Sequence, residues 1–129
     1  MRTFQILALT MCIAGAAAAQ TLKYQPAVVN LAGTLTSGTA EGSGGEKIVF
    51  PAIRLTQPVR VEPEATDKTN SPEDGVSLVQ LVISSTATMA LYESLKDKPA
   101  TVTGTLFHAS SAEYHHTKVL ITVREIEPQ

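Results

Sequence analysis

Three histidines lie close together near the C-terminal end of the chain, namely His108, His115 and His116. They sit where two alternating apolar runs of the segment Ala100–Arg124 meet a short polar loop, a pattern typical of a β-hairpin. Residues two apart in a strand share a face, so the alternation places His108 and His115 on the inward face and His116 on the other. Opposed Cβ atoms of paired strands are roughly 4.5–5.5 Å apart, so we expect the imidazoles of His108 and His115 to face each other.

Two neighbouring imidazoles suggest a metal site, for zinc or another divalent ion. Zinc in proteins takes about four ligands, so His108 and His115 would supply half of the set. Glu113, or a glutamate of the glycine-rich segment Thr36–Lys47, would complete it. The alternative is that both histidines cap the end of the hairpin through hydrogen bonds to backbone or hydroxyl groups. The sequence leaves both readings open.

Other classes of chemistry find little support in the composition. Ser110 and Ser111 lie beside the histidines, but a nucleophilic site needs a base, an acid and an oxyanion site in one geometry, so we expect no enzyme. The lone Cys12 precludes an intrachain disulfide scaffold. A net charge of −2 and the lack of tryptophan argue against nucleic-acid binding.

The N-terminus has the pattern of a secretory signal peptide. Arg2 precedes a short apolar run, and Ala17–Ala19 resembles a small-residue cleavage site. The run is too short for a membrane-spanning helix, which needs about 20 apolar residues. We therefore expect residues 1–19 to be removed near Ala19, leaving residues 20–129 as one periplasmic or secreted domain.

The rest of the chain supplies the elements that must position the histidines. Apolar alternation predicts strands before the hairpin, and Ser85 followed by a stripe at Met89, Tyr92 and Leu95 predicts one helix. The predicted segments are strands at 28–35, 47–55 with a continuation at 59–61, and 77–83, then a helix at 86–96. This order predicts a mainly β fold, a small five-stranded OB-fold-like Greek-key barrel with one helix between strands three and four.

Two polar segments connect the predicted strands, Thr36–Glu46 and the acidic Glu62–Gly75, and both are predicted to be mobile. OB-folds bind ligands with the loops that join strands one to two and four to five. Here these loops are 36–46 and 109–114, and topology brings them to one end of the barrel. The predicted binding residues of this end are Glu41, Glu46, His108, Glu113, Tyr114, His115 and His116.

Parts of the sequence resemble a bacterial secreted family known as domain of unknown function 4431. The resemblance rests mainly on the run Val102–Ala109 (VTGTLFHA), the turn His115–Thr117 (HHT) and the closing strand Val119–Val123 (VLITV). Tyr24–Leu35 and Val79–Val82 resemble two further strands of that family. The resemblance implies domain boundaries and an exported protein, and no activity. Members often carry more histidine in the turn than the Ser110–Glu113 segment has here.

These observations favour an exported, non-enzymatic binding module for a small ligand, a glycan or an envelope protein partner. A structural or envelope-stress accessory protein is the first alternative, and a metal-binding domain using His108 and His115 is the second. A protein-binding surface should expose apolar side chains, for which we name Phe50, Phe107 and Leu120. A small-ligand site should instead be a concave pocket between the two loops.

Overall fold

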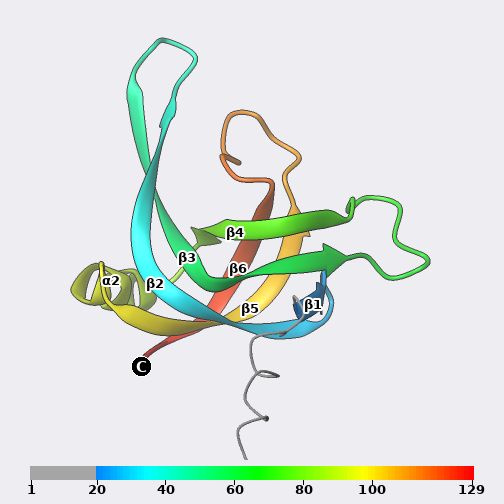
Figure 1. The fold of residues 1–129 in the computed structure, drawn as a ribbon. Coiled ribbons are helices and arrows are strands. Elements are labelled where there is room, and N and C mark those ends of the chain that lie inside the picture. The colour runs from blue at the N-terminus through cyan, green and yellow to red at the C-terminus, as the bar shows by residue number, and fades with distance from the viewer. Residues whose placement is uncertain (1–19) are drawn as a thin grey trace, which may run out of the picture.

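The computed structural model describes residues 20–129, in which six strands and one helix are arranged as Figure 1 shows. The predicted signal peptide, residues 1–19, lies outside the described residues. In chain order the elements are β1 (Gln20–Lys23), β2 (Val28–Glu41), β3 (Lys47–Glu62), β4 (Glu73–Val82), α2 (Thr86–Leu95), β5 (Pro99–His108) and β6 (Val119–Pro128).

The strands form one sheet in the order β1-β3-β2-β5-β6-β4, and β3 pairs with β4 as well. The fold is therefore mainly β with one helix between β4 and β5, as predicted. The sequence predicted five strands, and the sixth is β1, which pairs in parallel with residues 59–62 of β3. This strand is short, and only Leu22 in it is buried, so its alternation is too brief to predict from the sequence.

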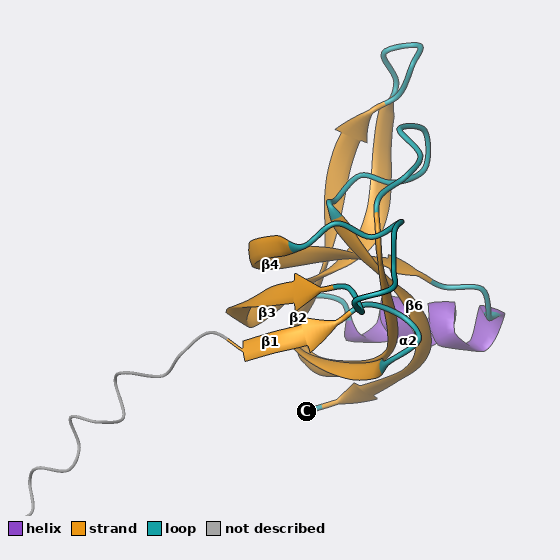
Figure 2. Cartoon of the chain, turned by 90° about the vertical axis from the view of Figure 1, so that its right-hand side faces the viewer, coloured by secondary structure: helices purple, strands orange, loops and turns teal. Residues whose placement is uncertain are grey.

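β2, with 14 residues, is more than twice as long as a typical strand of about 5–6 residues, and it changes partner along its length. Residues 28–34 pair with β5, and residues 33–41 pair with β3 as far as Glu41 opposite Lys47. The prediction of a loop over 36–46 was therefore wrong for 36–41, where β-branched Thr36 and Thr39 extend the strand. The two strands project as a long arm from the rest of the molecule, with residues 42–46 at its tip (Figures 1 and 2).

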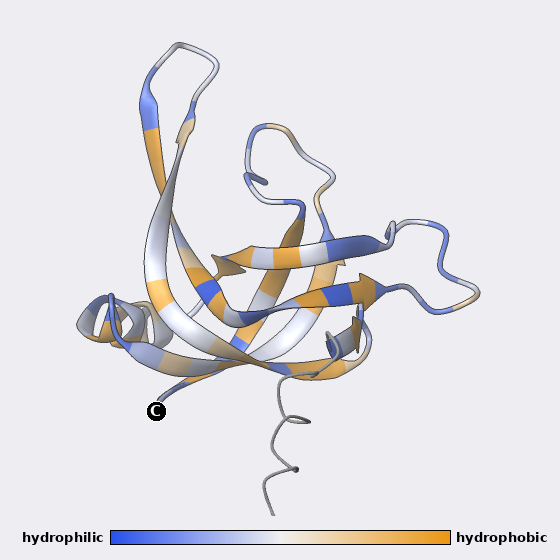
Figure 3. Ribbon diagram, in the orientation of Figure 1, coloured by the Kyte–Doolittle hydropathy of each residue, from blue (hydrophilic) through white to orange (hydrophobic). Residues whose placement is uncertain are grey.

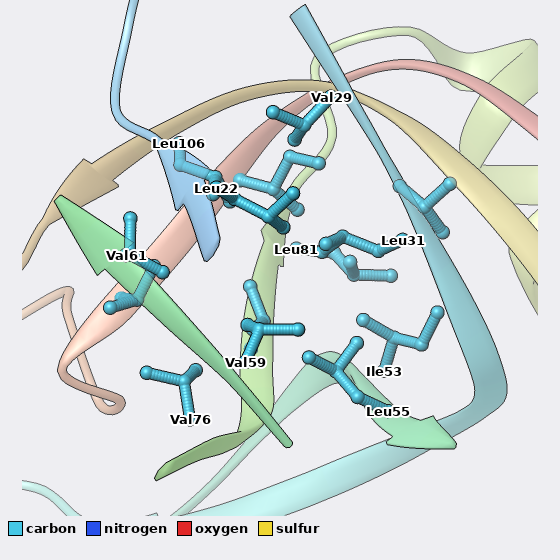
Figure 4. Packing of buried hydrophobic residues seen from close by; sticks show 14 of the residues in the cluster. Leu22, Val29, Leu31, Ile53, Leu55, Val59, Val61, Val76, Leu81 and Leu106 are labelled. Atoms are coloured by element: carbon cyan, nitrogen blue, oxygen red, sulfur yellow. The ribbon is translucent and has the colours of Figure 1, made fainter. Parts of the chain in front are cut away.

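The core lies between the strands and follows the alternation of the sequence. In β2 every second residue from Val29 to Leu35 is buried, and the hydropathy colouring of the ribbon shows the apolar positions spread over all the strands (Figure 3). Side chains from different strands, Leu31, Ile53 and Leu81 among them, point toward one another in Figure 4. Burial of this apolar surface is the main force that holds the strands together.

The helix α2 matches its prediction closely. The Ser85 hydroxyl accepts a hydrogen bond from the Thr88 backbone N–H, which caps the first turn. Tyr92 is buried, and its hydroxyl donates to the Thr36 carbonyl of β2 at 2.5 Å. Met89 and Leu95 pack against the core from the same face. The helix thus fixes the base of the β2–β3 arm. Within residues 20–129, no helix has the length and apolar character needed to cross a membrane.

Candidate functional site

A pocket lies between the β2–β3 arm and the loop that joins β5 to β6. Its volume is about 850 Å³, within the range of about 300–1,000 Å³ that is usual for ligand sites. It is lined by Glu41, Gly42, Ser43, Glu46, Ile48, Val49, Phe50, Pro51, Gln80, Ala112, Glu113, Tyr114 and His116. The loops after β2 and after β5 therefore converge on one site, as the sequence predicted.

An aromatic stack joins the two sides of this pocket. The rings of Phe50 in β3 and His116 in the β5–β6 loop are stacked, with centroids 5.1 Å apart and planes at 29°. Phe50 lies across from Gly38 of β2, and a Cβ atom at Gly38 would overlap the Phe50 ring. Only glycine leaves room for the ring over this strand, so Gly38 places Phe50 beneath His116.

Gln80 in β4 holds the β5–β6 loop in place against the pocket. Its side-chain amide donates to the Tyr114 carbonyl at 3.0 Å, and its side-chain oxygen accepts from the His116 N–H at 2.7 Å. The Gln80 backbone N–H donates to the Thr117 hydroxyl, which in turn donates to the Val119 carbonyl. Gln80 is buried, and these bonds satisfy its polar groups. Three positions of the loop, the Tyr114 carbonyl, the His116 N–H and the Thr117 hydroxyl, are therefore fixed from β4.

The rim of the pocket is acidic and partly apolar. Glu41, Glu46 and Glu113 line it, and no lysine or arginine does. Tyr114 is 66% exposed and Val49 is 58% exposed, so an aromatic ring and an aliphatic side chain face solvent beside these carboxylates. Glu46 Oε1 also accepts a hydrogen bond from the Gly44 N–H, which orders the tip of the arm.

His115 caps the β5–β6 loop and does not face His108, so the predicted histidine pair was wrong. Its Nδ1 accepts hydrogen bonds from the backbone N–H groups of Ser110 and Ser111 at 2.8 and 3.0 Å. Its ring lies edge-on to Phe107, at a centroid distance of 5.4 Å. In the sheet His108 is opposite Val119, because the connecting loop is longer than the predicted hairpin register allowed.

His108 belongs to a separate group of polar residues, here called the His108 cluster and made of Tyr24, Asp67, Asn70, Glu73 and His108. His108 Nε2 lies 2.7 Å from Glu73 Oε2, and its Nδ1 lies 3.1 Å from the Ala109 carbonyl oxygen. Both neighbouring oxygens can accept a hydrogen bond from the His108 ring, so the ring is held between Glu73 and the start of the β5–β6 loop.

Asn70 connects this cluster to the acidic loop between β3 and β4. Its side-chain oxygen accepts from the His108 backbone N–H at 2.8 Å, and its amide donates to Asp67 Oδ2 at 2.8 Å. The Tyr24 hydroxyl donates to the Ser71 carbonyl at 2.6 Å. Asn70 is buried, so the end of this loop is anchored to β5.

Two groups of the cluster have shifted pKa values. Burial, followed by the negative charges of Glu73 and Asp67, raises the pKa of Tyr24 to about 12. Hydrogen bonds from Asn70 and then from the Thr69 backbone lower the pKa of Asp67 to about 2. The Tyr24 shift thus reflects its burial beside the acidic loop, and the Asp67 shift reflects hydrogen bonds within that loop.

The described residues give no support to a metal centre. Within residues 20–129, no three residues of the types His, Cys, Asp and Glu are grouped so that they could hold a metal ion.

The predicted apolar patch does not form either. Phe50 and Leu120 are buried, with exposed fractions of 6% and 0%: the His116 ring of the β5–β6 loop stacks on Phe50, and Leu120 is paired with Gln80 on one side and Phe107 on the other.

Of the residues predicted from the sequence, Glu41, Glu46, Glu113, Tyr114 and His116 line the pocket. His108 and His115 do not. Gln80 was not among the predicted site residues, although it interrupts the apolar run Leu78–Ile83 with a buried amide. Gly38 was not predicted either, because its role depends on the aromatic residue across the strand pair.

Comparison with known proteins agrees with the resemblance seen in the sequence. Residues 78–127 match the family described as Domain of unknown function (DUF4431). The match covers β4 from Leu78, α2, β5 and most of β6, together with the Gln80 anchor and the loop that carries Tyr114 and His116. No protein of curated function matches the chain.

Proposed function

We propose that this protein is a non-enzymatic binding module whose ligand site is the pocket between the β2–β3 arm and the β5–β6 loop. One observation carries the proposal: two loops that are distant in the sequence converge on a concave site with an aromatic stack, an acidic rim and exposed Tyr114. Pockets that combine apolar walls with a few convergent polar groups are the usual form of ligand sites.

The proposal includes an OB-fold-like barrel formed by the five long strands. Its support is the set of pairings, since β3 pairs with β4 in addition to β2, and β4 pairs in parallel with β6. These pairings form a closed circuit, as a barrel requires: β3 pairs with β2, β2 with β5, β5 with β6, β6 with β4, and β4 with β3. OB-folds bind with the face and loops that correspond to this pocket.

The absence of catalytic function is part of the same proposal. The histidine nearest the serines, His115, uses Nδ1 to accept backbone hydrogen bonds. The pocket carboxylates lie on the arm and on the β5–β6 loop, and Ser43, the serine of the lining, is exposed at the arm tip. A binding role needs no more than the shape and charge that are present.

Export is the third part, and it rests on the sequence pattern of residues 1–19. Mass measurement of the protein recovered from the periplasm or the medium tests it. A product that begins near Gln20 supports the proposal, and a product that retains Cys12 with an added lipid contradicts it.

The binding site is tested by recording amide NMR spectra while adding three ligand classes in turn: neutral oligosaccharides, small amines and short peptides. We expect at least one class to shift amides of the arm tip and of residues 112–116. Shifts confined to other surfaces, or no response to any class, would refute the pocket as the site.

A further inference from the structure

We propose that the pocket binds an extended, basic segment of a protein partner, which adds as a strand to the free edge of β3 and places a lysine or arginine among the rim carboxylates. This inference rests on the proposed function and names its ligand. Three features of the described residues carry it: an unpaired strand edge, the charge of the rim and the apolar surface beside it.

The unpaired edge belongs to residues 47–51 of β3. On one side these residues pair with Glu41–Ser37 of β2. On the other side the pairing with β4 begins only at Ala52, opposite Gln80, and beyond that point β4 turns to pair with β6. Among the described residues, no other segment pairs with the backbone of 47–51.

The pocket lies along this same edge. Ile48, Val49, Phe50 and Pro51 form one wall, Gln80 closes the end, and residues 112–114 with His116 form the opposite wall. Neighbouring strands in a sheet are about 4.7–4.9 Å apart, and an exposed strand edge is a template for a peptide strand. An extended peptide in the pocket would continue the sheet in the place that β4 leaves, which is the binding mode called β-augmentation.

Charge decides which peptide fits. Glu41, Glu46 and Glu113 are all exposed at the rim, and the pocket is lined by no lysine or arginine, with Lys47 of the same edge outside the lining. A lysine or arginine side chain would be attracted to these carboxylates, and its positive end can also lie over the exposed Tyr114 ring. Val49 is exposed on the same edge and offers an apolar contact to the added strand. The side chain it would meet lies two residues from the basic one, because residues two apart in a strand share a face.

The test uses the whole exported protein and a capped peptide of alternating valine and lysine. We expect binding that shifts amides of residues 47–51 and 112–116, and that weakens as salt is added. Replacing Glu41, Glu46 and Glu113 together by glutamine should weaken binding roughly tenfold, from the usual strength of exposed ion pairs. The matched control replaces Glu93, Glu125 and Glu127, which are exposed on α2 and β6 and lie outside the pocket.

Two further probes separate strand addition from simple charge attraction. The same peptide is methylated on alternate backbone nitrogens, in each of the two possible phases. Strand addition predicts that one phase abolishes binding and the other leaves it nearly unchanged, because only alternate N–H groups face β3.

Several outcomes would overturn the inference. Equal binding of a valine–glutamate peptide would exclude the charge argument, and equal binding of spermidine would show that the ligand is a small cation. Equal weakening in the Glu93, Glu125, Glu127 control would show a general charge effect. If only oligosaccharides shift the pocket amides, this inference fails while the proposed binding function stands. If no ligand class shifts them, both fail.

Discussion

The pocket is lined by residues 112–114 and His116 of the β5–β6 loop, while the His108 cluster lies where that loop leaves β5, and both contain histidine, tyrosine and carboxylates. In the His108 cluster nearly every polar group has a partner within the protein: Asn70 bonds to His108 and Asp67, Glu73 to His108, and Tyr24 to Ser71. In the pocket the carboxylates of Glu41 and Glu113 and the Tyr114 ring face solvent instead.

This difference separates two uses of the same residue types. Buried polar groups that satisfy one another hold a structure in one arrangement. Polar groups that converge on a hollow and lack partners are available to a ligand. We therefore infer that the His108 cluster stabilises the domain and that the pocket binds. The following predictions test that division, beginning with the largest effect.

Asn70→Ala should have the largest effect on stability and none on ligand binding. The substitution removes the acceptor for the His108 backbone N–H and leaves a buried group unpaired, which typically costs about 1–3 kcal/mol of unfolding free energy. Urea denaturation measures the loss. The control is Asn30→Ala, which removes an exposed side chain that accepts a hydrogen bond from the Thr103 hydroxyl and should cost less unfolding free energy. Peptide binding that is lost in Asn70→Ala, with stability unchanged, would contradict the division.

Gly38→Ala should damage the pocket as well as stability. The new methyl group would overlap the Phe50 ring, so the ring must leave its stack with His116, and overpacking of this kind costs about 1–3 kcal/mol. We expect ligand binding to fall at least tenfold in an amide NMR titration. Gly44→Ala, at the exposed arm tip where the nearest atom belongs to the flexible Glu46 side chain, should leave both properties nearly unchanged.

Gln80→Leu should loosen the β5–β6 loop at a smaller cost. The Tyr114 carbonyl and the His116 N–H lose their bonds, but both lie near the surface where water replaces part of them, so we expect about 1 kcal/mol. Amide hydrogen exchange of residues 112–117 should become faster, while exchange at His108 stays slow. Equal acceleration at both positions would show that the loop and the His108 cluster open as one unit.

Tyr24 should give the smallest effect at neutral pH and a clear one in alkali. Its pKa is about 12 in the folded protein against about 10 when unfolded, so ionisation favours the unfolded chain. The resulting stability is complete below pH 10 and is lost as the pH rises from 10 toward 12. Denaturation curves at several pH values should show that the unfolding free energy of Tyr24→Phe falls less between pH 10 and 12 than that of the unsubstituted protein. Tyr114→Phe, which removes the hydroxyl of a tyrosine that is 66% exposed, is the matched control.

Alternation and capping signals determined much of this protein from the sequence. The period of two in residues 28–35 predicted a buried face that the structure confirms, and Ser85 marked the start of α2. In residues 119–123 the predicted inward residues Val119 and Ile121 are buried, but Leu120 between them is buried as well. These signals are local, since a strand face or a helix cap depends on residues a few positions apart. The convergence of the two loops followed from the order of strands and helix, and five of the seven predicted site residues do line the pocket.

The tertiary structure alone decided where His108 and His115 lie. Alternation holds only while the chain stays in the strand, and β5 ends at His108, so the phase could not be carried through the loop to His115. The extension of β2 to Glu41 could not be predicted because the glycine and serine residues in 36–46 have low strand propensity. In the structure, pairing with Lys47–Pro51 of β3 outweighs that low propensity. Gln80, Asn70 and Gly38 act on residues 12 to 38 positions away, and a single sequence carries no signal for contacts at that separation.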